Sequence, residues 1–207
     1  LILNIFNIMF IVFEGIDGVG KTSLAQKLSH QLNYKFIETP LSELMFNNPQ
    51  IYAKVVDYIH SYLPGFLRAW FYSFSNLYLS EKYCQEHSTN QRNLITNRYV
   101  VSNFAYNSDN YTGNFFANLF QFLAKPDLTI YLTADLETIK QRISNRNKDD
   151  KDLLQVEYNK NVREPLMLNF LKQNYDAKQV AIINTTNLNL DEVYKKIMDR
   201  IQKIQKI

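Results

Sequence analysis

Cysteine and histidine are scarce in this chain, and their scarcity excludes several kinds of site. The 207 residues include one cysteine, Cys84, and three histidines. A single thiol cannot form an internal disulfide, and neither residue type occurs at the spacing of a metal site. A disulfide framework and a zinc site are therefore excluded, and we expect Cys84 to pack in the core of a cytoplasmic protein.

An excess of charge of one sign and a long apolar run are also lacking. The 23 basic and 20 acidic residues give a net charge of +3, so no polycationic surface for nucleic acid is implied. The apolar start of the chain extends to Phe13 and is interrupted by Asn4 and Asn7. This is shorter than the roughly 20 residues that cross a bilayer, and it lacks the features of a signal peptide. We expect no membrane span, and residues 1–8 are interpreted as an N-terminal extension.

The rest of the sequence alternates short apolar runs with amphipathic segments. Apolar runs rich in β-branched and aromatic residues predict strands at 9–13, 34–38, 93–97, 128–132 and 180–183. Helical spacing of apolar residues follows at 22–32, at 41–88 with breaks at Pro49 and Pro64, and at 115–124, 135–146, 152–174 and 190–204. This order predicts one doubly wound α/β domain over 9–207, with a central five-stranded parallel sheet flanked by helices. Ligands of such sheets bind at the carboxyl ends of the strands.

A glycine-rich segment follows the first predicted strand. Residues 15–22 read Gly-Ile-Asp-Gly-Val-Gly-Lys-Thr and match G-x-x-x-x-G-K-[ST] at every fixed position. In such a loop backbone N–H groups surround the β-phosphate, the lysine bridges β- and γ-oxygens, and the threonine hydroxyl binds Mg²⁺. We predict an ATP and Mg²⁺ site, with Thr22 as the metal ligand. Its residues are Gly15, Asp17, Gly18, Val19, Gly20, Lys21, Thr22 and Ser23.

Four segments, in the same order along the chain, resemble those of thymidylate kinases. Residues 10–23 are similar to the opening of that family, and 97–107 to its D-R-Y-x-x-S-x-x-A-[YF]-[QT] segment. Residues 126–132 resemble its P-D-L strand, and 184–186 lie where the family has its adenine loop. The resemblance implies a P-loop kinase that transfers the γ-phosphoryl group of ATP to a deoxynucleoside monophosphate, with dTMP as the expected acceptor.

The resemblance also implies roles for single residues. Arg98 would hold the acceptor phosphate, Asp17 would meet the sugar 3′-hydroxyl, and Asn184 and Thr185 would contact adenine. The acceptor's base and sugar would be lined by residues from two segments, namely Phe71 or Tyr72, Ser102, Tyr106 and Asn107.

A mobile lid is implied at about 142–152. Because the glycine-rich loop carries no arginine, the lid would supply the cation of the transition state, Arg146, with Arg142 and Lys151 as helpers. A solvated helix end is the alternative interpretation of these charges. A homodimer packed near the aromatic-rich segment 66–83 is also implied.

Three positions depart from the family pattern and keep other functions open. Asn97 stands where the family has an aspartate, which removes a charge near the metal. Glu38 stands where the family has an arginine that meets the acceptor phosphate, and Ser75 or Asn76 replaces an arginine that reads thymine. The first alternative is a deoxynucleoside kinase with Glu38 as general base on a 5′-hydroxyl. The second is a relative that binds nucleotides without catalysis.

Overall fold

The computed structural model describes residues 9–84, 93–108, 112–146 and 152–205. A parallel sheet forms its centre, with the strand order β2-β3-β1-β4-β5. The predicted α/β fold with five parallel strands is therefore confirmed. The strands are β1 (Phe10–Glu14), β2 (Lys35–Ile37), β3 (Leu94–Asn97), β4 (Leu128–Thr133) and β5 (Val180–Asn184).

The strands agree with the predicted ones to within one residue at each end. β1 lies between β3 and β4, with Val12 paired to Thr96 on one side and to Thr129 on the other. Every residue of β1 is buried, as an unbroken apolar run predicts for the centre of a parallel sheet. The predicted functional residues that follow β1 and β3 therefore lie close together at the carboxyl ends of these two strands.

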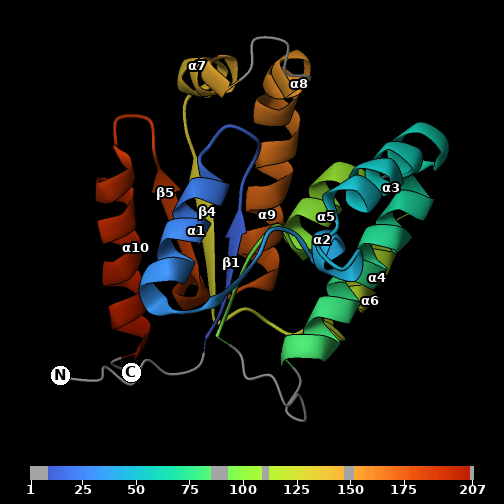
Figure 1. Cartoon of the computed structure of the whole chain (residues 1–207), viewed down its shortest axis with the longest axis horizontal. Coiled ribbons are helices and arrows are strands. Elements are labelled where there is room, and N and C mark those ends of the chain that lie inside the picture. The colour runs from blue at the N-terminus through green and yellow to red at the C-terminus, as the bar shows by residue number, and fades with distance from the viewer. Residues whose placement is uncertain (1–8, 85–92, 109–111, 147–151, 206–207) are drawn as a thin grey trace.

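Helices cover both faces of the sheet (Figure 1). The breaks predicted at Pro49 and Pro64 separate three helices, α2 (Pro40–Leu44), α3 (Pro49–Tyr62) and α4 (Gly65–Cys84). The others are α1 (Lys21–Leu32), α5 (Val100–Asn107), α6 (Gly113–Phe120), α7 (Leu136–Arg146), α8 (Asp152–Tyr158), α9 (Glu164–Asn174) and α10 (Leu190–Gln205).

The predicted helices were wrong in three respects. The sequence analysis assigned no helix to 100–107, where α5 lies, and it extended α6 too far, because Gln121 to Leu123 form a turn. The predicted helix over 152–174 is divided by a π-helical turn at Asn159–Arg163. A π turn holds one extra residue, so it changes which side chains of α8 and α9 share a face.

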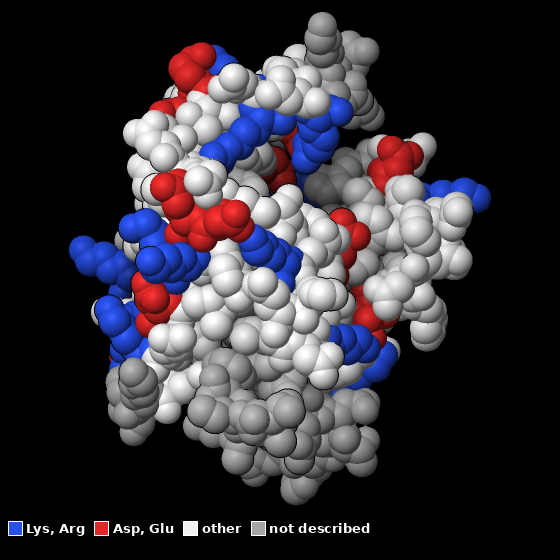
Figure 2. All heavy atoms as spheres, turned by 60° about the vertical axis from the view of Figure 1, so that its left-hand side comes forward, with Lys and Arg blue, Asp and Glu red and all other residues white. Residues whose placement is uncertain are grey.

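Helices lie both beyond the carboxyl end of the sheet and to one side of it. Figure 1 shows α7 and α8 beyond the loop that joins β1 to α1, and α2 to α6 grouped to one side. Figure 2 shows basic and acidic side chains interspersed over one face. Cys84 is a buried thiol, as expected. Within the described residues no helix combines the length and the hydropathy that a membrane span requires.

Candidate active site

Gly15 and Gly18 of the glycine-rich loop each combine a positive φ with close surroundings that leave no room for a side chain. Gly15 has φ +132°, and a Cβ there would lie 2.3 Å from the carbonyl oxygen of Leu132. Gly18 has φ +83°, and its Cβ would lie 2.8 Å from Ile139 and 3.0 Å from Ile143 of α7. Side chains rarely adopt such φ values, so the turn favours glycine at Gly15 and Gly18, and at Gly18 the packing of α7 requires it as well.

Lys21 lies in the first turn of α1 and is buried. Its Nζ donates to the carbonyl oxygen of Ile16 at 2.7 Å and lies 3.9 Å from Oδ1 of Asp17. Burial, with the positive charge of Arg98 as a second cause, lowers the pKa of Lys21 to about 7. The amine is thus held at the base of the loop, where a helix N-terminus also favours anions.

The hydroxyl of Thr22 is in contact with the end of β3. Asn97 donates from Nδ2 to Oγ1 of Thr22 at 3.2 Å. The other amide atom of this buried residue, Oδ1, has no hydrogen-bond partner among the described residues. A hydroxyl and an unsatisfied amide oxygen are neutral oxygen ligands of the kind that Mg²⁺ accepts beside phosphate oxygens.

Asp17 and Arg98 form an ion pair across the site. Asp17 also accepts a hydrogen bond from the hydroxyl of Tyr106 at 3.1 Å. Burial alone would raise the pKa of Asp17, but the charges of Arg98 and Lys21 outweigh it and hold the pKa far below its usual value. The carboxylate is therefore ionised and able to accept a hydrogen bond from a sugar hydroxyl.

Glu14, at the end of β1, fixes the segment that carries Arg98. It is fully buried, and its Oε1 accepts from the backbone N–H groups of Tyr99 at 2.8 Å and Ser102 at 3.3 Å. Its Oε2 accepts from the Ser102 hydroxyl at 2.5 Å. Burial raises the pKa of Glu14 despite these bonds. Arg98 has φ +62°, a conformation uncommon for a non-glycine residue, which the bonds to Glu14 stabilise.

Two cavities join to form one cleft. The larger, of about 740 Å³, follows the glycine-rich loop, and the smaller, of about 360 Å³, lies between α3, α4 and α5. Thr39, Tyr52 and Arg98 line both. We name the first the loop cavity and the second the side cavity. Arg98 thus stands where the loop cavity and the side cavity meet.

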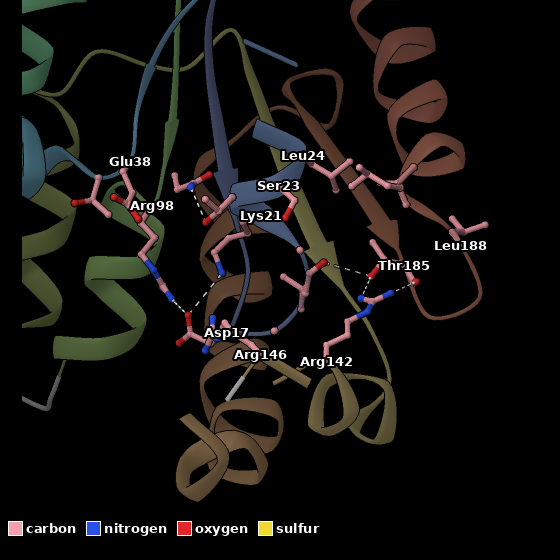
Figure 3. A pocket seen from close by; sticks show the side chains of 18 of the residues that line it. Asp17, Lys21, Ser23, Leu24, Glu38, Arg98, Arg142, Arg146, Thr185 and Leu188 are labelled. Carbon is pink, nitrogen blue, oxygen red and sulfur yellow. Dashed lines mark hydrogen bonds and ion pairs between the residues drawn. The ribbon is translucent and has the colours of Figure 1, made fainter. Parts of the chain in front are cut away.

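The far end of the loop cavity is formed by the segment after β5 (Figure 3). Arg142 of α7 donates to Oγ1 and to the carbonyl oxygen of Thr185, each at 2.8 Å. Leu188 and Val193 complete this end, and the sequence analysis missed both. Asn184 is exposed and is not among the lining residues, so of the two predicted adenine contacts only Thr185 lies at the cavity.

Arg146 lies at the end of α7 and lines the loop cavity. Its side chain is 57% exposed, and Nη2 lies 2.8 Å from Oδ2 of Asp152, the first residue of α8. The predicted lid at 142–152 is described only at its two ends, and Lys151 lies outside the described residues. Arg142 belongs to a different part of the site from Arg146, since it contacts Thr185.

The side cavity brings together most of the predicted acceptor residues. Tyr72, Ser102, Tyr106 and Asn107 all line it. Phe71 is not among its lining residues, so of the two aromatic candidates only Tyr72 lies at this cavity. The loop cavity contains Ser23 and also Glu38, which is exposed at the end of β2.

Several residues of the side cavity carried no sequence signal. His60 of α3 shares a hydrogen bond of 2.9 Å with the hydroxyl of Tyr72, and Asn103 lies on the same face of α5 as Asn107. Arg163, for which no role was predicted, lies 4.2 Å from the centre of the Tyr106 ring. Such contacts depend on which helices pack against each other. The spacing of residues along the chain does not reveal that packing.

The comparison with protein families gave one match over most of the chain. The model described as thymidylate kinase matches residues 13–197. The probable thymidylate kinase of Methanocaldococcus jannaschii is 26% identical over 204 residues, which cover 95% of this chain and 97% of that protein. The probable thymidylate kinase of Methanococcus aeolicus is 29% identical, over 93% of this chain and 95% of its own length.

Solved structures of two kinases share the fold. The thymidylate kinase of Candida albicans superimposes with a TM-score of 0.69 at 21% identity and covers 94% of this chain and 91% of its own. A deoxyadenosine kinase of M. mycoides gives a TM-score of 0.66 at 19% identity, over 94% of this chain and 100% of its own. At such identities the likeness concerns the fold alone.

Proposed function

Because the chain belongs to the thymidylate kinase family, we propose that its cleft holds ATP beside thymidine monophosphate and transfers the γ-phosphoryl group between them. As a member of this family the protein is a nucleotide kinase. The bond from the γ-phosphorus to the β,γ-bridging oxygen breaks, and an oxygen of the acceptor phosphate bonds to the γ-phosphorus, giving ADP and dTDP. The observation that carries the proposal is the junction of the loop cavity and the side cavity at Arg98.

The loop cavity suits the triphosphate and base of ATP. The first turn of α1 provides N–H groups for the phosphates, and Lys21 provides a buried positive charge. Arg142, held against Thr185, offers a flat guanidinium on which adenine can stack. Leu188 and Val193 supply apolar surface for the same base.

Thr22 and Asn97 suit a magnesium ion that accompanies ATP. The Thr22 hydroxyl and the unsatisfied Oδ1 of Asn97 are the oxygens that would hold it, directly or through water. When bound, the ion neutralises charge on the β- and γ-phosphates. Asn97 adds no charge of its own, and its Nδ2 orients the Thr22 hydroxyl.

The side cavity suits the acceptor. Arg98 would hold the 5′-phosphate at the junction, and Asp17 would accept a hydrogen bond from the 3′-hydroxyl. Tyr72 offers its ring to the base, while Ser102, Tyr106 and Asn107 line the sugar and base. Binding the acceptor then places its phosphate near the end of the triphosphate, which lowers the barrier by proximity.

Arg146 is the residue that we propose as the cation of the transition state. It lines the loop cavity from the end of α7, and its pairing with Asp152 joins it to the first turn of α8. A guanidinium next to the γ-phosphate stabilises the charge that spreads over its oxygens during transfer.

A coupled assay of ADP release tests the proposal. With ATP, Mg²⁺ and dTMP we expect turnover that depends on all three, and we expect Lys21→Ala to reduce kcat by about 10²–10³-fold with the fold intact. Thermal unfolding of the variant controls for stability. Absence of turnover with dTMP, or equal turnover without Lys21, would contradict the proposed function.

Glu38 favours a second candidate, a deoxynucleoside kinase. Its carboxylate is exposed in the cleft that also contains Arg98. An uncharged 5′-hydroxyl must lose a proton when it attacks, and a carboxylate at this point could accept it. Turnover with thymidine in place of dTMP in the same assay would favour this function.

We also propose a homodimer that packs through α4. Phe66, Trp70 and Phe74 recur at every fourth residue and are 42%, 51% and 60% exposed, so they form one apolar stripe along this helix. The ring of Phe115 from α6 lies 4.4 Å from that of Trp70 and extends the stripe. Burying such a surface against a second copy would remove it from water.

A further inference from the structure

Arg163 lies in the π-helical turn between α8 and α9 and is not among the residues that line the loop cavity or the side cavity. A π turn is rare and occurs frequently at functional sites. Asn159, its first residue, and Glu164, which follows it, are both buried although they are five residues apart. In an α-helix such residues point about 140° apart, so the wider turn allows both to face the interior.

The turn is fixed to the sheet, and the guanidinium of Arg163 is fixed to its own helix. The hydroxyl of Thr133, at the end of β4, donates to Oε1 of Glu164 at 2.5 Å. Nη1 of Arg163 donates to Oδ1 of Asn159 at 2.5 Å and to Oε1 of Gln155 at 3.1 Å. These bonds hold the guanidinium in one direction, which is toward α5.

The ring of Tyr106 in α5 contacts two guanidinium groups. The guanidinium carbon of Arg163 lies 4.2 Å from the ring centre, and that of Arg98 lies 5.0 Å from it. A cation over an aromatic face is attracted to the ring. The hydroxyl of the same ring donates to Oδ2 of Asp17 at 3.1 Å, and Asp17 pairs with Arg98. Tyr106 therefore connects Arg163 with the ion pair that we propose to bind the sugar and phosphate of the acceptor.

We propose that Arg163 is a positioning residue that holds the ring of Tyr106, and through it the ion pair that binds the acceptor. This inference rests on the proposed function. Without Arg163 the ring loses the closer of its two cation contacts, and the hydroxyl that orients Asp17 is free to move with the ring. The binding of ATP depends little on this contact, because Lys21 is held by the carbonyl oxygen of Ile16.

Calorimetry with dTMP and with MgATP, titrated separately, tests the inference by binding, without requiring turnover. Arg163→Met keeps the length of the side chain but removes its charge. Its affinity for dTMP should fall by about five- to tenfold and its affinity for MgATP by less than about twofold. Arg163→Lys keeps a cation near the ring and should bind dTMP within about threefold of the natural chain. Thermal unfolding checks that each variant is folded.

A double-mutant cycle separates an effect through Tyr106 from a general effect on the turn. In a Tyr106→Leu background the ring is absent, so Arg163→Met should weaken dTMP binding by less than a further factor of about two. Lys160→Met is the matched control, because it removes an ion pair with Glu164 in the same turn. Its dTMP affinity should stay within about twofold of the natural chain even if its stability falls.

The inference is overturned by an unchanged dTMP affinity in folded Arg163→Met, or by a loss of MgATP affinity as large as the loss of dTMP affinity. It is also overturned if the loss persists in the Tyr106→Leu background or if Arg163→Lys binds dTMP no better than Arg163→Met. An equal loss in Lys160→Met would assign the effect to the turn as a whole and would contradict it too. If the natural chain binds no dTMP, the proposed function fails, and this inference fails with it.

Discussion

Asn97 donates a hydrogen bond of 3.2 Å from its Nδ2 to Oγ1 of Thr22. The contact connects the end of β3 with the first turn of α1, 75 residues earlier in the chain. Asn97 thus places a neutral amide where the family pattern has a carboxylate. The part of the loop cavity beside Thr22 is therefore less negative than it would be with aspartate.

Replacing that amide by a carboxylate should strengthen metal binding. In Asn97→Asp the added charge would attract Mg²⁺ beside the Thr22 hydroxyl, because carboxylate oxygens are preferred ligands of this ion. The Mg²⁺ concentration that half-saturates ATP binding should fall by about three- to tenfold, as measured by calorimetric titration. Asn97→Ala serves as the neutral control and should not show this fall. An unchanged metal dependence in Asn97→Asp would argue against a metal next to this residue.

ATP binding should take up a proton at Lys21. Because burial lowers the pKa of this amine to about 7, part of it is neutral at pH 8, and the negative phosphates favour the charged form and raise the pKa again. Uptake should therefore be large above pH 7 and small near pH 5.5, where the amine is already charged. Calorimetry in buffers of different ionisation enthalpy measures it. Lys21→Met should abolish the difference between buffers, and its persistence would assign the proton to another group.

Glu38→Gln should separate the two acceptor types. If the acceptor is dTMP, loss of a negative charge near its phosphate should leave activity unchanged or lower KM by about two- to fivefold. If the acceptor is a 5′-hydroxyl, loss of a general base should lower kcat by about 10²–10⁴-fold. Steady-state kinetics with dTMP and with thymidine distinguishes the outcomes. A large loss of kcat with dTMP would show that Glu38 takes part in transfer to a monophosphate, contrary to this expectation.

Glu43 of α2 should stabilise the fold in a pH-dependent way. It is 4% exposed and accepts hydrogen bonds from Lys82 at 2.7 Å, from Asn47 at 2.9 Å and from the hydroxyl of Tyr83. Burial would raise the pKa of Glu43, but the bonds from Lys82, Tyr83 and Asn47 lower it to about 2. Its folded pKa lies below its unfolded pKa, so the stabilisation is fully present above about pH 4.5 and is lost as the pH falls toward 2.

The corresponding variant is Glu43→Gln. At pH 7 we expect the free energy of unfolding to fall by about 1–3 kcal/mol, because Lys82 and Tyr83 lose a charged partner. The difference from the natural chain should shrink between pH 4.5 and 2. Denaturant unfolding at several pH values measures both effects. Asp57→Asn, on the exposed face of α3, is the control, and an equal loss there would show that the effect is not specific to the Glu43 cluster.

A charge placed in the apolar stripe of α4 should prevent self-association. Trp70 is 51% exposed and contacts Phe115. Trp70→Lys would therefore place a charge at the centre of the proposed interface and not in the core of the single chain. Light scattering should give the mass of a dimer for the natural chain and of a monomer for the variant. Tyr58→Lys, on α3 and outside the stripe, should remain dimeric.

The fold was predictable because it depends on patterns that are local in the sequence. A buried strand such as β1 is an unbroken apolar run, and the loop at 15–22 is defined by glycines whose φ values exclude other residues. The helix α5 was not predictable in this way. It begins with Val100 and Val101, which favour strands, and its first turn is capped from a distance by Glu14.

The candidate site was predictable only in part, for a related reason. Neighbouring residues of a helix point about 100° apart, so the sequence alone could not decide whether Phe71 or Tyr72 faces the cavity. Arg142 was predicted as a helper of Arg146, but the packing of α7 against the segment after β5 directs it to Thr185. The direction in which such a side chain points depends on how the helices pack against the rest of the fold, and no short sequence motif specifies that packing.

The close approach of α7 to Gly18 means that one position of the chain satisfies two independent demands. A larger residue there would disturb the backbone of the loop that we propose to bind phosphate. It would also push away Ile139 and Ile143, and with them the helix that ends at Arg146. Two separate requirements, the positive φ of the loop and the packing of α7, therefore oppose substitution of this glycine. Any design that aims to reshape nucleotide preference should leave it untouched and vary the far wall of the cleft.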